Sequence, residues 1–172
     1  MRRAFSVVEL LTTIAGLVII LGLMVSLARH VRLVSAEVLT RDILHRLDEA
    51  MASYVQRNGG LPPGIPPFIP DNGEPPPESL LQRTAERNNE AFVRALKTDG
   101  LLAGRFDDLS IAYYDEARVR DAWGSPIVFM EKMNPAIGMN PKGWFFFSAG
   151  PDRQYLTRDD NINSYDQPIL RR

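Results

Sequence analysis

An uninterrupted apolar run near the N-terminus, from Phe5 to Ala28, constrains the fold more than any other feature of this chain. It contains no Pro and a single charged residue, Glu9. About 20 consecutive apolar residues suffice for a helix to cross a bilayer, so the run predicts one transmembrane helix over residues 5–28. A carboxylate in hydrocarbon costs about 2.5–3.5 kcal/mol on insertion scales and is by default functional. Glu9 is therefore the first candidate functional residue.

Other N-terminal signals fit the run less well. A secretory signal peptide has a shorter apolar region, of about 7–15 residues. A lipoprotein signal requires a Cys at the cleavage site, and the chain has no Cys. A plain signal anchor matches the length but gives Glu9 no role. Basic residues flank the run on both sides, at Arg2, Arg3, Arg29 and Arg32, so the positive-inside rule does not fix its orientation.

The helical pattern continues beyond the apolar run. No Gly or Pro occurs over residues 29–57, where apolar residues recur at three- and four-residue spacing, and Asn58, Gly59 and Gly60 then give a stop signal. The recurring apolar positions are Leu33, Ala36, Leu39, Ile43, Leu47, Ala50 and Tyr54. The pattern predicts one long helix with a membrane half and an amphipathic half. A break near Arg29 into two helices is the alternative.

The rest of the chain predicts a small α+β domain. Residues 61–77 are Pro-rich and indicate an extended connection. A second helix is expected over 78–98, although Asn88 and Asn89 interrupt its pattern and two short pieces are the alternative. Strands are expected within 105–148, before a C-terminal loop over 149–172. The strand candidates, rich in aromatic and β-branched residues, are 106–114, 126–133 and 144–147. A small antiparallel sheet of this kind needs a helix packed on it for stability.

Several functional classes lack their usual residues. The net charge is −1 with no basic stripe outside the membrane flanks, so nucleic acid is not an expected partner. The absence of Cys excludes disulfides and thiolate metal sites, and His30 and His45 share no metal-ligand spacing. Ser148 lies outside any G-x-S-x-G elbow, and no phosphate-binding loop or H-E-x-x-H occurs. We therefore expect no enzyme, with a membrane-tethered hydrolase as the remote alternative.

The N-terminus resembles that of type IV pilin-like proteins. In that family a short basic leader ends at a small residue, and a prepilin peptidase cuts before a Phe or Met that is then N-methylated. Residues 1–4 match the leader, Ala4 the small residue, Phe5 the new N-terminus, and Glu9 the acid at the fifth mature position. The family usually has Gly where this chain has Ala4. The resemblance implies that Glu9 pairs with the amine of Phe5 on a neighbouring subunit.

The C-terminal part resembles the major pseudopilins of type II secretion. That group has a D-x-W-G-x-P turn, a later S-x-G-x-D segment and an acidic loop. The matching residues here are Asp121, Trp123, Gly124, Pro126, Ser148, Gly150, Asp152, Asp159, Asp160 and Ile162. In the family the acidic loop binds calcium, which implies Asp152, Asp159 and Asp160 as side-chain ligands. A solvated polar tail is the alternative for this loop.

The resemblance implies a function, partners and a location. It implies a pilin-like fold and a structural subunit of a type II secretion pseudopilus, which is a short helical filament that drives protein export. The expected partners are further copies of the chain, other pseudopilins, the prepilin peptidase and an inner-membrane assembly platform. It implies a single pass through the inner membrane, with the N-terminus cytoplasmic and residues 29–172 periplasmic. A type IV pilus subunit is the alternative.

Overall fold

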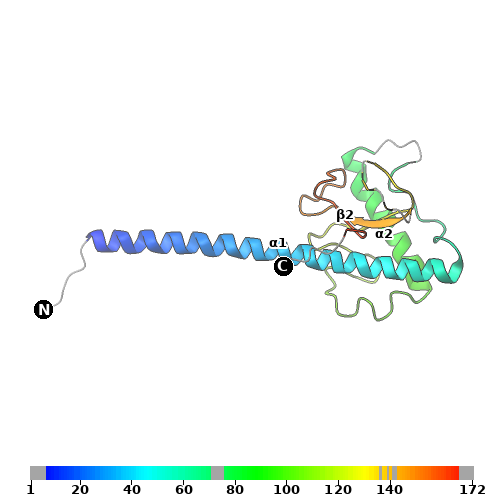
Figure 1. The fold of residues 1–172 in the computed structure, drawn as a ribbon, viewed down its shortest axis with the longest axis horizontal. Coiled ribbons are helices and arrows are strands. Elements are labelled where there is room, and N and C mark those ends of the chain that lie inside the picture. The colour runs from blue at the N-terminus through cyan, green and yellow to red at the C-terminus, as the bar shows by residue number, and fades with distance from the viewer. Residues whose placement is uncertain (1–6, 71–75, 136, 139, 141–142, 167–172) are drawn as a thin grey trace. The chain divides into compact units, whose positions relative to one another are not determined.

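The computed structural model describes residues 7–70, 76–135, 137–138, 140 and 143–166. Its elements follow the order α1, α2, β1, β2, β3 (Figure 1). Two compact units, Met1–Ser35 and Ala36–Arg172, divide the chain, and each is described by itself. The expected cleavage site at Ala4 and Phe5 lies outside the described residues.

The first helix, α1, spans Val7–Asn58 without a break. The alternative of two helices separated near Arg29 is therefore wrong. Helix α1 ends where the asparagine and glycines predicted it: Gly59 adopts a positive φ of 74° and donates its N–H to the Val55 carbonyl at 2.9 Å. A left-handed glycine just after the last turn is a common way to end a helix, because it satisfies carbonyls that would otherwise lack partners.

Within the second unit, one face of α1 forms part of the hydrophobic core. Its buried residues are Thr40, Ile43, Leu44, Leu47, Ala50 and Met51. They pack with Phe92, Val93 and Leu96 of α2, which spans Glu78–Thr98. Leu33, an expected member of the same apolar stripe, is exposed and belongs to the first unit. The buried face therefore begins later along the helix than the apolar spacing predicted.

The three strands form one antiparallel sheet in the order β1, β2, β3. Strand β1 spans Val128–Met130, β2 spans Phe145–Ser148 and β3 spans Ile162–Asn163. Phe129 pairs with Phe146, and Ser148 pairs with Ile162. The expected α+β class, with a long N-terminal helix and a small antiparallel sheet, is confirmed. The sheet extends into the expected C-terminal loop, because β3 lies there.

The expected strand over 106–114 is wrong, because these residues form turns and bends, apart from one isolated antiparallel bridge between Tyr114 and Val119. Phe106 is buried in the core, which accounts for part of the apolar pattern. Arg46 of α1 donates to the Arg105 carbonyl at 2.6 Å and to both carboxylate oxygens of Asp108 at 2.6 and 3.0 Å. These contacts from the α1 side chain hold the segment as a loop.

Both faces of the sheet are buried. Phe129 and Phe146 face the core that contains α1, whereas Phe145 and Phe147 belong to a second cluster. The second cluster also contains Phe68 and Ile69 of the Pro-rich segment, Leu81 and Ala85 of α2, and Tyr155 of the C-terminal loop. The Pro-rich segment therefore covers a face of the sheet.

Asn88 and Asn89 do not interrupt α2, which is continuous. Both are fully buried, and their side-chain amides bind the backbone of the segments packed beside the helix. Asn88 exchanges two hydrogen bonds with Phe129 on the edge of β1, accepting from its N–H at 2.7 Å and donating to its carbonyl at 2.9 Å. Asn89 does the same with Val119 at 2.9 and 2.7 Å. The two side-chain amides thus form the hydrogen bonds that the backbone of a neighbouring strand would otherwise make.

Candidate functional site

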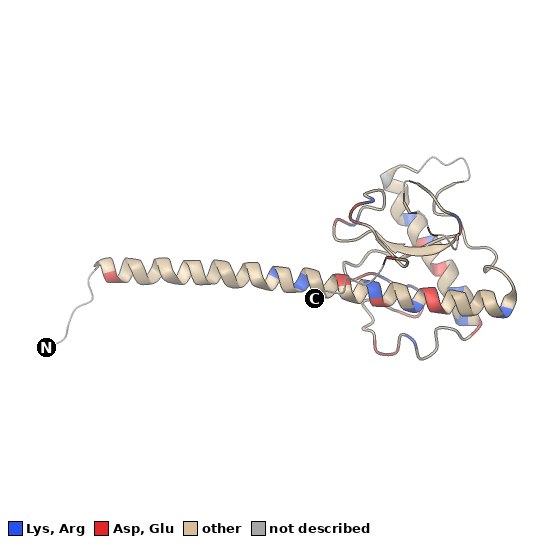
Figure 2. Cartoon of the chain, in the orientation of Figure 1, with Lys and Arg blue, Asp and Glu red and all other residues tan. Residues whose placement is uncertain are grey.

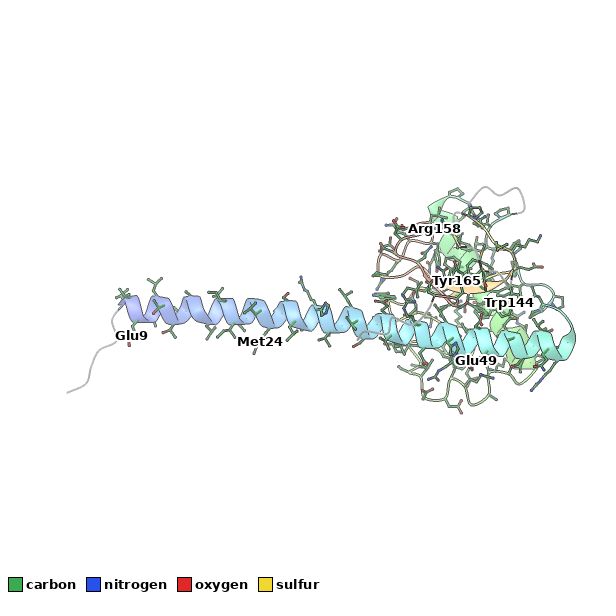
Figure 3. All side chains as sticks on the ribbon, viewed as in Figure 1. Glu9, Met24, Glu49, Trp144, Arg158 and Tyr165 are labelled. Atoms are coloured by element: carbon green, nitrogen blue, oxygen red, sulfur yellow. The ribbon has the colours of Figure 1, made fainter. Side chains whose placement is uncertain are left out.

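The first part of α1 presents apolar side chains around its circumference. Among the described residues, α1 is a helix long and apolar enough to cross a membrane, with a mean hydropathy of 2.5 in its most apolar window. None of that window is buried within the structure. Figure 2 shows the long stretch of α1 without Lys, Arg, Asp or Glu, and Figure 3 shows its side chains, including Met24, projecting outward. Met24 is 64% exposed.

Glu9 lies in the first turn of α1. Its main-chain carbonyl accepts hydrogen bonds from the hydroxyls of Thr12 and Thr13, at 3.0 and 2.7 Å. The free N–H groups of a helix start carry partial positive charge, which favours a carboxylate in this turn. The structure thus places the one acid of the apolar run at the end of α1 that borders the expected cleavage site.

The D-x-W-G-x-P motif forms a tight turn around a buried carboxylate. Asp121 is fully buried and accepts hydrogen bonds from the backbone N–H groups of Trp123 and Ser125, at 2.9 and 2.8 Å. Its second oxygen accepts a 2.6 Å hydrogen bond from the Ser148 hydroxyl. Burial raises the pKa of Asp121 above its usual range, whereas these hydrogen bonds act in the opposite direction. The motif therefore has a structural role.

Ser148 links this turn to the second motif. It is fully buried at the end of β2, and its oxygen also accepts the Gly150 N–H at 3.0 Å. The Ser148 hydroxyl donates its proton in the hydrogen bond to Asp121, whereas an activated serine nucleophile donates to a general base such as histidine or lysine. The two predicted C-terminal motifs, far apart in sequence, thus meet in one hydrogen-bond network.

Thr40 of α1, which the sequence did not indicate as a functional residue, also stabilises the D-x-W-G-x-P turn. Thr40 is fully buried, and its hydroxyl accepts the Ala122 N–H at 3.1 Å. A threonine within an apolar stripe ordinarily costs free energy unless its hydroxyl finds a partner. A polar residue within an apolar stripe indicates that its side chain has a buried hydrogen-bond partner. Local sequence pattern could not predict that this partner is Ala122, 82 positions away.

The acidic loop after β2 does not gather its carboxylates. Asp152 accepts the Gln154 N–H at 2.9 Å, whereas Asp159 and Asp160 are exposed. In the described part of the chain, no group of three His, Cys, Asp or Glu side chains could hold a metal ion. Asn161 is 7% exposed, and its side-chain oxygen is buried with no hydrogen-bond partner among the described residues. The amide oxygen of Asn161 is therefore an available hard ligand in this loop.

A cavity of about 220 Å³ lies between the Pro-rich segment and the residues that follow β1. Its walls include Ile65, Pro66, Asn88, Lys132 and Met133. Asp121, the buried acid with a raised pKa, is not part of its lining. The cavity and the perturbed acid therefore lie apart, in contrast to the usual arrangement of an acid–base active site.

The structure thus brings together Asp121, Ser148 and Gly150 but keeps Glu9 in the separate first unit. In comparisons with known proteins, no family model, curated protein or solved structure matches this chain. The chain's own residues and their arrangement are therefore the basis for any functional assignment.

Proposed function

We propose that this chain is a structural subunit of a filament of the type IV pilin-like class, most specifically a type II secretion pseudopilin. The observation that carries the proposal is the first part of α1, whose large apolar side chains are exposed along the whole span and include one acid, Glu9. Water-soluble proteins rarely expose a contiguous apolar surface of this extent. Lipid before assembly, and other copies of α1 after it, would cover this surface.

The proposed mechanism is mechanical. Cleavage between Ala4 and Phe5 creates an amine next to the span, and Glu9 of a neighbouring subunit pairs with it. The pair offsets the cost of an acid in an apolar environment and sets the register between helices. Subunits leave the inner membrane one at a time and extend a short filament that pushes exported protein outward, with energy from a separate cytoplasmic ATPase.

The second unit supports this proposal by having its own core. The buried face of α1 begins at Thr40, and the α1, α2 and sheet residues of this unit bury one another. Such a unit needs no contribution from the apolar span to fold. A chain of this kind keeps a folded domain on a helix that moves between membrane and filament.

Processing is tested by mass spectrometry of the chain extracted from membranes of a cell that contains a prepilin peptidase. The expected product begins at Phe5 and carries one methyl group on its amine. A peptidase-deficient strain is the control, in which the chain retains Met1. A chain that keeps Met1 in both strains contradicts the proposal.

Glu9→Ala is expected to insert and fold like the wild type but to assemble poorly. An ion pair that offsets about 2.5 kcal/mol corresponds to about a sixtyfold change in the assembly equilibrium, since 1.4 kcal/mol is a factor of ten. Filament yield is measured by cross-linking and electron microscopy, with urea denaturation checking the soluble unit. Glu9→Asp is the matched control, because it retains the charge and should recover part of the yield. Wild-type yield in Glu9→Ala would exclude the proposed pairing.

Calcium binding by the loop over 150–166 is the second part of the proposal. The unpartnered Asn161 oxygen favours it, because Ca²⁺ takes amide and main-chain oxygens as well as carboxylates. Asp152, Asp159 and Asp160 would supply the charge that a calcium ion requires. Bound calcium would hold the loop against the mutual repulsion of these acids.

Calcium is expected to raise the melting temperature of a soluble fragment that begins near Arg29. A ligand at about 100 times its Kd adds about 2.7 kcal/mol to the free energy of unfolding. Asp159→Ala should abolish the rise and leave the metal-free melting temperature unchanged, because its side chain is exposed. Asp107→Ala, an exposed acid in another loop, is the control and should respond like the wild type. Equal melting temperatures with calcium and with chelator would exclude the site.

A subunit of a type IV pilus is the second candidate function, because the same cleavage before Phe5 and the same pairing of Glu9 are proposed for it. Electron microscopy separates the two, since a pilus is a long surface fibre and a pseudopilus is short. The tethered hydrolase has little support: Ser148 holds a structural network, and the cavity lacks the perturbed acid.

A further inference from the structure

A basic cluster follows the apolar span on α1. Arg29, His30 and Arg32 are all exposed and belong to the first unit. The stretch from Val7 to Ala28 has no Lys or Arg, as the absence of blue from this part of α1 shows in Figure 2. At 1.5 Å per residue this stretch is roughly 33 Å long, close to the roughly 30 Å of a bilayer core. A span that starts at Val7 therefore places Arg29 at the opposite headgroup layer.

The two arginines lie on one side of the helix. Residues three positions apart are neighbours on a helix surface, so Arg29 and Arg32 present their guanidinium groups together. Their long side chains extend along the helix and place the charge in the polar layer while the stems contact apolar surface. Arginine donors match phosphate oxygens in a two-pronged geometry.

These charges are not neutralised by carboxylates of the described residues. The nearest acid that follows them, Glu37, accepts two hydrogen bonds from Arg41, at 3.0 and 3.2 Å. No ion pair forms to Arg29 or Arg32 within the described part of the chain. The cluster therefore offers its positive charge to a partner outside the chain.

We propose that Arg29 and Arg32 bind the phosphate groups of anionic phospholipids, in the headgroup layer on the side where the chain continues into residues 36–172. This inference rests on the proposed insertion of α1 into a membrane. A phospholipid is the favoured occupant because the span length sets the two arginines at the depth of the phosphates. Each arginine near an anionic membrane surface strengthens binding about fivefold.

The binding has a consequence for assembly. A subunit that leaves the membrane must release these lipids, so the anionic lipid content of the bilayer sets how firmly each subunit is held before it joins a filament. The arginines thus act as a retention site separate from Glu9, which lies at the other end of the span.

The test uses the full chain in vesicles of equimolar phosphatidylcholine and phosphatidylglycerol. Spin-labelled lipid of each kind reports, by electron paramagnetic resonance, the fraction of lipid held at the protein surface. The wild type should prefer phosphatidylglycerol about 25-fold, which is about fivefold for each of the two arginines, and high salt should reduce the preference by screening. Arg29→Gln with Arg32→Gln should bring the ratio close to one.

The matched control is Arg83→Gln with Arg87→Gln, which removes the same charge from exposed positions on α2. This control should keep the wild-type preference. The inference is overturned by a wild type without preference, by a double variant at 29 and 32 that retains it, or by equal loss in the control. It is also overturned if the 29 and 32 variant weakens cross-linking between copies and leaves the lipid ratio unchanged, since the partner is then another subunit.

Membrane insertion is checked separately by extraction with alkaline carbonate. A wild-type chain that carbonate releases contradicts the proposed function and the lipid site together. A chain that stays in the membrane but shows no lipid preference overturns the lipid site alone, and the filament proposal stands.

Discussion

Asn89→Ala is expected to lower the free energy of unfolding of the soluble unit by roughly 3 kcal/mol or more. The Asn89 amide donates to the carbonyls of Val119 and Ile127, at 2.7 and 2.6 Å, and accepts the Val119 N–H at 2.9 Å. Asn89 is fully buried, so water does not replace the lost partner. Each buried backbone group left without a partner costs about 1–3 kcal/mol. The Ile127 carbonyl and the Val119 N–H lose theirs, whereas the Val119 carbonyl still accepts the Ile127 N–H at 3.1 Å. Urea denaturation of the fragment from near Arg29 measures the change.

Gln82→Ala is the matched control for this substitution. Gln82 is an exposed amide on the same helix, and its replacement should change the free energy of unfolding by no more than about 0.5 kcal/mol. Asn89→Asp adds a second comparison, because it keeps the oxygen that accepts the Val119 N–H but removes both donors. A loss below about 1 kcal/mol in Asn89→Ala would mean that water or a backbone shift satisfies the strand segments, and the assigned role of the amide would be wrong.

Gly150→Ala is expected to destabilise the soluble unit by about 2–5 kcal/mol. Gly150 has a φ of 72°, which an L-residue with a side chain adopts only at a cost of about 1–2 kcal/mol. A Cβ at this position would also overlap the Asp160 carbonyl oxygen, so the backbone of the acidic loop would have to move. Calorimetry should show a lower melting temperature, and any calcium response of the loop should be lost with it.

Gly104→Ala separates the cost of the positive φ from the cost of the Cβ contact. Gly104 has nearly the same φ, 74°, but a Cβ there would meet no atom within 4 Å. Its replacement should cost only the backbone term, about 1–2 kcal/mol. If both substitutions cost the same, close contact between Gly150 and the Asp160 carbonyl does not constrain the loop.

Local pattern was sufficient for the helices and for two of the strands. The apolar run and the absence of Pro from residues 7–58 favour a helix whatever the tertiary environment of this segment, and α1 spans that range. The β-branched and aromatic residues near Val128 and at 145–147 favour strands in the same way, and β1 and β2 lie there. These features depend on hydrogen bonds and side-chain spacing among near neighbours, which the order of residues specifies.

Contacts between distant residues decided the remainder. Phe106 and its neighbours have strand composition, yet Arg46 of α1 holds Arg105 and Asp108 in a loop. Asn88 and Asn89 resemble helix breaks, yet their amides complete the edge of β1 and the segment beside it. A buried polar side chain has its free energy set by its partner, and that partner lies 30 or more positions away in these cases.

The same distinction applies to the candidate site residues. Glu9 is identified by the cost of one acid within an apolar run, which needs no tertiary structure. Asp121 belongs to one sequence motif, and Ser148 and Gly150 belong to another. Their structural role became evident only because folding brings the turn, the end of β2 and the start of the acidic loop into one hydrogen-bond network. Composition and spacing therefore determine which segment is long and apolar enough to cross a membrane. Packing determines which polar residues hold the fold, because burial changes their free energy only once the partners are in contact.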